Sequence, residues 1–271
     1  MSAGAGPLRL GTRGSPLALR QAELVASSIG GEVETVVLRT GGDLGAGGDK
    51  RRWVDTIETA LLAGEIDLAV HSAKDLPAEL AEGLEIAGSP AREDPRDALC
   101  GADGIRPGMR VGTASARRKA QLLALEPSLS IEPLRGNIDT RLRKRGERGL
   151  DAIVLAACGL DRLGLAHEIG HRFEPEELLP EAGQGALALQ VRSGEGHLVA
   201  AAGDEETRRR VEDERAVVAA VGGGCLAPVA AYHDGTTLTG LIAAEDGSWL
   251  ERRTGDDPEA LGVELLRLSE R

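Results

Sequence analysis

The stretch Gly64–Leu80, GEIDLAVHSAKDLPAEL, contains an apolar run that stops at a polar cluster ending in a single carboxylate, Asp75. The run at 66–70 predicts a buried strand bounded by turns, and Pro77 biases the residue before it away from the helical region. Asp75 is therefore predicted at the carboxyl end of a strand, which is the edge where open α/β sheets bind their ligands. Taken alone, the same carboxylate also fits a helix N-cap or a solvent-exposed charge.

Two segments far apart in the chain repeat one pattern, GTRGSPLAL at 11–19 and GTASARRKAQL at 112–122. In each, a short strand ends at a Gly-Thr turn and a helix follows. Ser15 before Pro16 is a favourable N-cap and first-turn pair. Amide N–H groups at such a turn, together with a basic side chain such as Arg13, favour a carboxylate or a phosphate. The pattern predicts two similar halves whose polar turns face a shared cleft.

The length of 271 residues suits two or three domains. Strands alternate with helices, which predicts an α/β fold. We expect the first domain at 1–98 and 186–204 and the second at 99–185, with a hinge where the chain crosses between them. A change in composition after residue 205 predicts a small α+β domain at 205–271.

Charge is unevenly distributed along the chain. The formal net charge of -12 argues against broad binding of nucleic acid or of an anionic membrane, because both need a positive field over a large surface. Between residues 113 and 148, however, the chain has nine Lys and Arg residues and only four Asp and Glu residues, a local excess of five positive charges. This excess predicts a site for a small polyanion.

The three cysteines, Cys100, Cys158 and Cys225, are far apart and odd in number, so neither a disulfide framework nor a metal site is predicted. Cys225 follows the glycines at 222–224, which let a ligand approach the backbone and leave the thiol unshielded. The alternative is a helix-capping loop that needs a small residue. The chain shows no apolar signal core and no stretch of bilayer-spanning length, which predicts a cytoplasmic protein.

The segment Gly41–Lys50 is rich in Gly and predicts a flexible loop or lid. It is not a phosphate-binding P-loop, because no Gly-Lys-Ser/Thr follows. Arg51, Arg52 and Trp53 then lead into a helix expected at 54–63.

Eight segments occur along the chain in an order that chance does not explain: LRLGTRGSPLALRQA, LAVHSAKDLPAEL, AREDPRDAL, VGTASARRKAQL, LRGNIDTRL, DAIVLAACGLDRLGL, LPEAGQGALAL and ERAVVAAVGGGCLAPVAAY. Together they resemble the porphobilinogen deaminase (hydroxymethylbilane synthase) family over nearly the whole chain. The resemblance implies a transferase of tetrapyrrole and haem biosynthesis. Such an enzyme joins four porphobilinogen molecules head to tail with loss of four ammonias, and water releases the linear hydroxymethylbilane.

The resemblance also implies a dipyrromethane primer, bound as a thioether to Cys225. It implies two lobes like those of periplasmic binding proteins plus the small cysteine-bearing domain, with porphobilinogen and water as the partners of a monomer. Arg suits such a ligand because it pairs with carboxylates in bidentate fashion.

The resemblance assigns roles to individual positions. Asp75 would be the catalytic carboxylate, which stabilises the cation left when ammonia departs. The residues implied to bind substrate are Arg13, Arg135, Arg141, Arg162 and Trp53. The groups implied to hold the cofactor, besides Cys225, are Ser15, Lys74, Asp75, Thr113, Ser115, Arg117, Arg118 and Arg141.

The lid entry departs from the family pattern. Relatives carry a Gly-Lys-Gly-Leu-Phe type of segment, where this chain has GDKRRWVD at 48–55. Trp53 falls where the family has a phenylalanine, and it is expected to stack on a pyrrole.

Two other functions remain open from the residues alone. A two-lobed binding protein for small anions would share the fold and the arginines, without chemistry. A cysteine hydrolase would use Cys225 as nucleophile and His233 as base.

Overall fold

The computed structural model describes residues 6–40, 51–77, 80–222 and 228–270, with the backbone alone at 51–53. By its contacts the chain divides into two compact units. The first is Met1–Arg92 with Ala186–Arg208, and the second is Glu93–Gly185 with Arg209–Arg271. Each unit is described by itself below.

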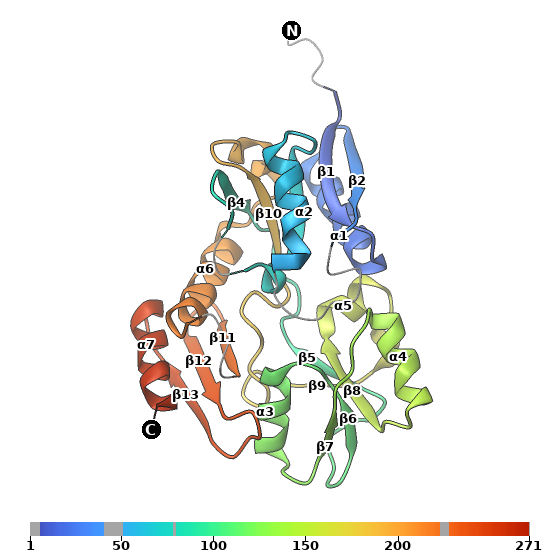
Figure 1. Ribbon diagram of the computed structural model, residues 1–271, viewed down its shortest axis with the longest axis vertical. Coiled ribbons are helices and arrows are strands. Elements are labelled where there is room, and N and C mark those ends of the chain that lie inside the picture. The colour runs from blue at the N-terminus through green and yellow to red at the C-terminus, as the bar shows by residue number, and fades with distance from the viewer. Residues whose placement is uncertain (1–5, 41–50, 78–79, 223–227, 271) are drawn as a thin grey trace. The chain divides into compact units, whose positions relative to one another are not determined.

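The first unit is built on a five-stranded mixed sheet (Figure 1). Its strand order is β2-β1-β3-β10-β4, in which β1 is parallel to β2 and β3, while β10 runs antiparallel to β3 and β4. The strands are β1 (Leu8–Arg13), β2 (Val33–Leu38), β3 (Leu68–Ser72), β4 (Leu84–Gly88) and β10 (Leu187–Arg192). The helices are α1 (Pro16–Ile29), α2 (Arg51–Leu62), and the short 3-10 turns η2 (Ala73–Asp75) and η4 (Gly196–Ala202).

The second unit contains a five-stranded sheet of the same plan, with the order β7-β6-β8-β5-β9. Here β6 is parallel to β7 and β8, and β5 runs antiparallel to β8 and β9. The strands are β5 (Asp97–Cys100), β6 (Arg110–Gly112), β7 (Ser130–Glu132), β8 (Ala152–Ala156) and β9 (Ile169–Arg172). The helices are α3 (Ala116–Leu125), α4 (Ile138–Glu147), α5 (Ala157–Arg162) and the 3-10 turn η3 (Ala166–Glu168).

A three-stranded antiparallel sheet, β11-β12-β13, completes the second unit. It consists of β11 (Val229–His233), β12 (Leu238–Ala243) and β13 (Leu250–Thr254). Helix α6 (Glu205–Ala220) leads toward it and α7 (Pro258–Ser269) follows it (Figure 1). One face of this sheet packs on the two helices through Leu238, Ile242, Val217 and Leu265.

The predicted α/β class, with two sheet-based lobes and a small C-terminal α+β part, is confirmed. In both five-stranded sheets the antiparallel strand, β10 or β5, directly follows a crossing of the chain between the units, after residue 185 or 92. Each of these two strands is thus the first strand of its unit after the chain crosses. The domain boundaries chosen from the sequence stay a prediction.

Local sequence explains the repeated helices. The side chain of Ser15 accepts a hydrogen bond from the Ala18 amide (3.2 Å), and that of Ser115 accepts one from the Arg118 amide (3.4 Å). Both serines are therefore N-caps, a position at which serine is strongly preferred. The core beneath is aliphatic, with Leu10, Leu68 and Leu189 fully buried in the first sheet.

Two expectations need correction. The stretch at 91–97 is polar and contains Pro95, which predicts a link outside the core, but Asp97 is fully buried and begins β5. The apolar run at 151–157 predicts a central parallel strand, and it forms the central strand β8, which is parallel to β6 but antiparallel to β5, so the sheet is mixed. Strands β5 and β9 and helix α5 had no predicted counterpart.

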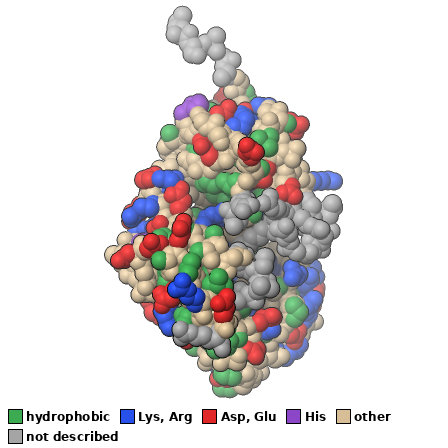
Figure 2. Space-filling view, turned by 60° about the vertical axis from the view of Figure 1, so that its left-hand side comes forward, with side chains coloured by type: hydrophobic (Ala, Val, Ile, Leu, Met, Phe, Trp, Pro, Cys, Tyr) green, Lys and Arg blue, Asp and Glu red, His purple; other side chains and the backbone are tan. Residues whose placement is uncertain are grey.

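Within the described ranges, no helix combines the length and the apolar character needed to cross a membrane. On the face shown in Figure 2, acidic and basic side chains are interspersed.

Candidate functional site

In the first unit, the predicted site residues gather at the carboxyl edge of the sheet. Strand β1 ends at Arg13, and its parallel neighbour β3 leads directly into η2, which contains Lys74 and Asp75. The amide of Gln21 on α1 donates to the Ser72 hydroxyl (2.9 Å) and so ties the helix to the end of β3. Lys74 and Asp75 are half-buried, so the turn holds a carboxylate at the edge where ligands bind in such sheets.

A buried polar chain lies behind this edge. The Nε2 atom of His71 is 3.0 Å from Oε1 of Gln190, and Nε2 of Gln190 donates to Oε1 of Glu58 on α2 (2.8 Å). Burial lowers the pKa of His71 to about 4, against the opposing effect of the Gln190 hydrogen bond, and the charge of Arg13 lowers it further. The imidazole is therefore neutral at pH 7. Because Gln190 donates to Glu58, its carbonyl oxygen is left to accept from His71.

In the second unit, the matching edge carries the turn between β6 and α3. The Thr113 hydroxyl oxygen accepts a hydrogen bond from the Ser115 amide (3.2 Å). Ser115 in turn caps α3. In both side chains the oxygen serves as an acceptor, so each hydroxyl keeps its own proton to donate to a ligand.

The two arginines at the start of α3 converge on Asp97. Arg118 donates to Oδ1 of Asp97 from Nε (3.0 Å) and Nη2 (2.7 Å). Nη1 of Arg117 lies 2.8 Å from Oδ2 of the same carboxylate. Burial would raise the pKa of Asp97, but the charges and hydrogen bonds of the two guanidiniums outweigh it and hold that pKa far below its usual range. Asp97 is thus ionised, and the cluster keeps one surplus positive charge.

The two arginines differ in their remaining donors. Arg118 also donates to the Val154 carbonyl from Nη1 (3.1 Å), so each of its nitrogens is bound to protein. Arg117 donates to the Leu179 carbonyl from Nη1 (2.7 Å), but its Nε and Nη2 are buried and have no partner among the described residues. A buried N–H group without a partner is costly, and a carboxylate is its natural complement.

Gln184 completes this cluster. Its amide donates to Oδ1 of Asp97 (2.8 Å) and to the Pro95 carbonyl (2.7 Å). Neither Asp97 nor Gln184 was predicted from the sequence. For Asp97 the sequence does carry a signal, a charged residue at the head of an otherwise apolar run, DALC at 97–100.

The remaining predicted arginines of this unit occupy separate places. Arg135 is exposed on the turn after β7. Arg141 on α4 donates to the Gly136 carbonyl (2.6 Å), where a φ of 126° favours glycine. Arg162 at the end of α5 is buried, and it donates to Glu93 (3.0 Å) and to the Gly185 carbonyl (2.9 Å). Arg162 thereby joins the two segments at which the chain enters and leaves this unit. Its Nη1 atom makes no hydrogen bond to a described residue.

The cysteines of the described ranges are both internal. Cys100 and Cys158 are buried and free, and burial raises the pKa of Cys100 to about 11. Cys225, the Gly41–Lys50 segment and the side chain of Trp53 lie outside the described residues. No group of three or more His, Cys, Asp or Glu side chains able to hold a metal occurs in the described part of the chain.

Comparison with known proteins gives a consistent result. The family model for "Porphobilinogen deaminase, dipyromethane cofactor binding domain" matches residues 8–200. The curated porphobilinogen deaminase of Thermus thermophilus is 45% identical over 281 residues, covering 95% of this chain and 93% of its own. That of Syntrophobacter fumaroxidans is 43% identical over 290 residues, covering 96% and 94%.

Comparison with solved structures gives matches of low sequence identity and low TM-score. A putative periplasmic sulfonate-binding protein of Methylobacillus flagellatus is 11% identical with a TM-score of 0.41, covering 78% of this chain and 66% of its own. A periplasmic binding protein of Salmonella typhimurium with high arginine specificity is 12% identical with a TM-score of 0.39, covering 76% and 97%. Because these TM-scores are low, the fold assignment is based on the strand orders described above.

Proposed function

Because the chain belongs to the porphobilinogen deaminase family, we propose that it is the enzyme that joins four porphobilinogen molecules into hydroxymethylbilane. Four ammonias are lost, and one water releases the linear product. The matched family domain binds dipyrromethane, which, when bound, supplies the primer to which the substrate pyrroles are added. An anion-binding protein without chemistry is disfavoured, because the curated relatives that span nearly the whole chain are named as deaminases.

The observation that carries the proposal is the buried cluster of Arg117, Arg118 and Asp97. It has one surplus positive charge and two unpaired guanidine nitrogens on Arg117. The acetate and propionate groups of a dipyrromethane are carboxylates, and they fit this deficit. We assign Arg117 as the principal cofactor carboxylate ligand, with Arg118 fixing its position and adding charge.

Four further proposed cofactor ligands lie on the two repeated edges, and each offers a hydroxyl or an ammonium suited to a carboxylate: Ser15, Lys74, Thr113 and Ser115. Arg141 on α4 is proposed to add a guanidinium. Arg118 is proposed to act through its charge, because its nitrogens are bound to protein. Arg13, Arg135, Arg141 and Arg162 are proposed to bind the substrate carboxylates, and Trp53 is proposed to stack on a substrate pyrrole.

Asp75 is proposed as the catalytic residue. As a carboxylate at the end of β3, it stabilises the positive charge that develops on the pyrrole when ammonia leaves. A fixed charge of this kind in a water-poor site contributes several kcal/mol to catalysis. Asp75→Asn is expected to retain the bound cofactor and lose turnover, as measured by product formation and intact mass. Full turnover of this variant would refute the assignment.

Cys225 is proposed to bind the cofactor as a thioether. Its support within the chain is that Cys100 and Cys158, the other two cysteines, are buried. Intact-protein mass spectrometry is the test. We expect an added mass of dipyrromethane size that disappears in Cys225→Ser and persists in Cys100→Ser. A bare polypeptide purified from porphobilinogen-replete cells would overturn the proposal.

Three further features are proposed on the sequence alone: a division into domains at 1–98 with 186–204, 99–185 and 205–271; a monomer; and a cytoplasmic location. Light scattering on the purified protein tests the second of these. A hydrolase using Cys225 and His233 is not retained, since the Nδ1 atom of His233 accepts the Gly235 amide (3.0 Å) as part of a turn.

A further inference from the structure

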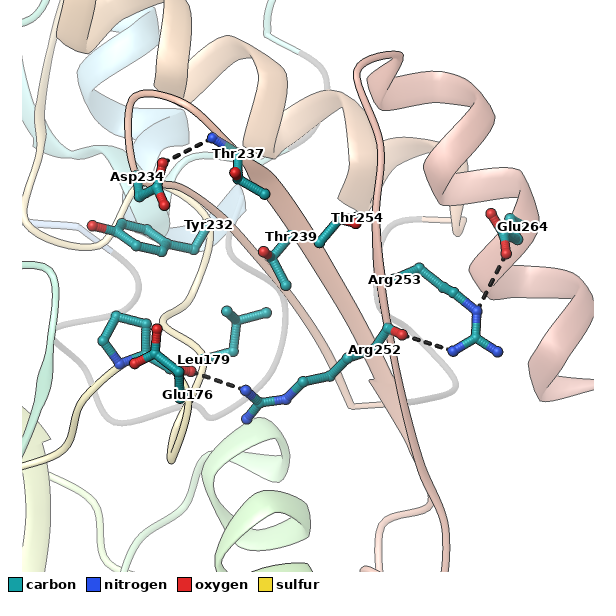
Figure 3. Close-up of a pocket in the computed structure, with 11 residues that line it drawn as sticks. Glu176, Leu179, Tyr232, Asp234, Thr237, Thr239, Arg252, Arg253, Thr254 and Glu264 are labelled. Atoms are coloured by element: carbon teal, nitrogen blue, oxygen red, sulfur yellow. Dashed lines mark hydrogen bonds and ion pairs between the residues drawn. The ribbon is translucent and has the colours of Figure 1, made fainter.

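A pocket of about 540 Å³ lies on the C-terminal sheet, in the second unit (Figure 3). Its lining comes from β11, β12, β13, the turn at 234–237, Glu264 of α7 and the segment at 175–179. None of the residues assigned above to catalysis, cofactor or substrate takes part in it. Its volume is within the range of about 300–1,000 Å³ that is typical of small-molecule sites.

The floor of the pocket is one row of side chains across the sheet. Tyr232 pairs with Thr239, and Thr239 pairs with Thr254, so the three lie side by side on adjacent strands. The next row on the same face, Ala230 and Leu241, packs against Ala120 of α3 and Leu179. The sheet face thus passes from a covered apolar part to a part that carries the Tyr232 ring and two threonine hydroxyls. Neither threonine hydroxyl makes a hydrogen bond with a described residue, so both are available to a ligand.

A guanidinium forms one side of the pocket. Arg252 donates to the Pro175 carbonyl (3.1 Å), the Gln121 side chain (3.3 Å) and the Glu177 carbonyl (3.4 Å). These acceptors are neutral, and no described carboxylate forms an ion pair with it. Burial lowers the pKa of Arg252, and the charge of Glu176, on the rim, acts in the opposite direction. By contrast, the neighbouring Arg253 is ion-paired to Glu251 (2.8 Å) and Glu264 (3.3 Å).

A carboxylate forms another side, above the Tyr232 ring (Figure 3). Oδ1 of Asp234 accepts the amides of Thr236 (2.7 Å) and Thr237 (2.8 Å) and also the Thr236 hydroxyl (2.8 Å). These hydrogen bonds lower the pKa of Asp234, so it is ionised at pH 7. All of them end on Oδ1, which leaves Oδ2 as an acceptor for a ligand.

We propose that this pocket binds a small ammonium carboxylate of the α-amino-acid class. Its carboxylate pairs with Arg252, its ammonium pairs with Asp234 and Glu176, and an apolar side chain lies against Tyr232 and Leu179. The lining carries charges of both signs at different sides, which a purely anionic or purely cationic ligand would satisfy only in part. The site is separate from the edges that carry the proposed deaminase chemistry, and its occupation does not depend on that function.

The test is an NMR titration of the purified holoprotein with three ligands that share a phenylethyl skeleton. L-Phenylalanine carries both charges, 3-phenylpropionate only the carboxylate, and 2-phenylethylamine only the ammonium. We expect saturable shifts of the Tyr232, Thr239 and Arg252 amides with phenylalanine, and binding weaker by about tenfold or more for each single-charge analogue. Equal binding of the three, or no saturable shift up to the solubility limit, would overturn the proposal.

Matched variants separate the ligand contact from turn structure. Asp234→Asn removes the charge while its amide oxygen still caps the turn, and Asp246→Asn makes the same change in the turn of the next hairpin, where the Asp accepts the Ser248 amide (3.0 Å). We expect Asp234→Asn to weaken phenylalanine binding by about tenfold and to leave 3-phenylpropionate unchanged, because only the ammonium loses its partner. Asp246→Asn should change neither. Equal effects of the two variants on phenylalanine would contradict a direct contact.

Discussion

Asp97 is the counter-charge of two buried guanidiniums, and its side chain is fully buried. Asp97→Asn keeps the shape and one acceptor but leaves both positive charges without a partner. Breaking a buried ion pair in this way costs about 3–5 kcal/mol. We expect a loss of that size in the free energy of unfolding, measured by urea denaturation.

The control for this variant is Asp67→Asn. Asp67 forms a comparable pair with Arg9 (2.7 Å), but both side chains are partly exposed. Such pairs contribute at most about 1 kcal/mol. If the two substitutions cost the same, the Asp97 cluster would not be a buried charge network in solution.

His71 predicts a pH dependence of stability. Its pKa is about 4 in the folded chain, against an ordinary value of 6.5, so the unfolded chain takes up a proton first as the pH falls. The contribution of the neutral imidazole is therefore complete above pH 6.5 and is lost between there and about pH 4, with a slope of about 1.4 kcal/mol per pH unit.

His71→Gln tests this slope, since glutamine can hydrogen-bond to Gln190 but does not titrate. In urea unfolding between pH 6.5 and 4.5, we expect the unfolding free energy of the variant to depend less steeply on pH than that of wild type. The difference in slope should correspond to nearly one fewer proton taken up on unfolding. An unchanged slope would show that His71 is not the group responsible, whatever the absolute stability of the variant.

At the scale of elements, Glu214 on α6 connects two segments of the second unit. One contains Gly183, just before the chain returns to the first unit, and the other contains His233 at the end of β11. It is fully buried, and its carboxylate accepts the amides of Gly183 (2.7 Å) and His233 (2.8 Å). Glu214→Gln converts one acceptor into a donor, so one amide loses its partner at a cost of about 1–3 kcal/mol. We expect faster hydrogen exchange at the Gly183 or His233 amide.

The matched control is Glu212→Gln, on the exposed face of the same helix. It should leave both exchange rates unchanged. Equal acceleration in the two variants would point to general fraying of α6 instead of a lost hydrogen bond.

The sequence predicted those elements that have a clear period or cap. The GTASARRKAQL pattern at 112–122 predicts a strand, a Gly-Thr turn and a helix, and the structure has β6, the turn at Thr113 and α3 there. Strand β5 was not predicted, because its first residue is charged and it follows directly on a polar stretch that contains Pro95. Asp97 is acceptable inside the protein only because Arg117 and Arg118, about 20 positions later, neutralise it, and a pairing across that distance has no local signal.

The same limit applies to the site. Residues such as Asp75 and Ser15 were located because they follow strands, and the carboxyl edge of a sheet is a general place for ligands. The resemblance to a family named the arginines, but it did not show that Arg118 is engaged at every nitrogen while Arg117 keeps two unpaired. That distinction depends on the Val154 and Leu179 carbonyls, which belong to other elements.

At the scale of the whole molecule, the proposed contact between Arg117 and the cofactor would couple cofactor loading to stability. A group that binds only the folded chain raises its melting temperature, and a charge-assisted hydrogen bond contributes about 1.5–3 kcal/mol. We expect the loaded protein to melt about 5 °C or more above cofactor-free Cys225→Ser, in calorimetry of mass-verified samples.

Arg117→Lys shows whether this difference arises at the proposed contact. Lysine keeps the positive charge beside Asp97 but presents no planar pair of N–H groups to a carboxylate. The melting-temperature gap between the loaded protein and its Cys225→Ser counterpart should therefore shrink in the Arg117→Lys background, or the variant should fail to retain the adduct. A gap of unchanged size in a fully loaded variant would move the stabilising contact away from Arg117 and leave its buried nitrogens unexplained by the cofactor.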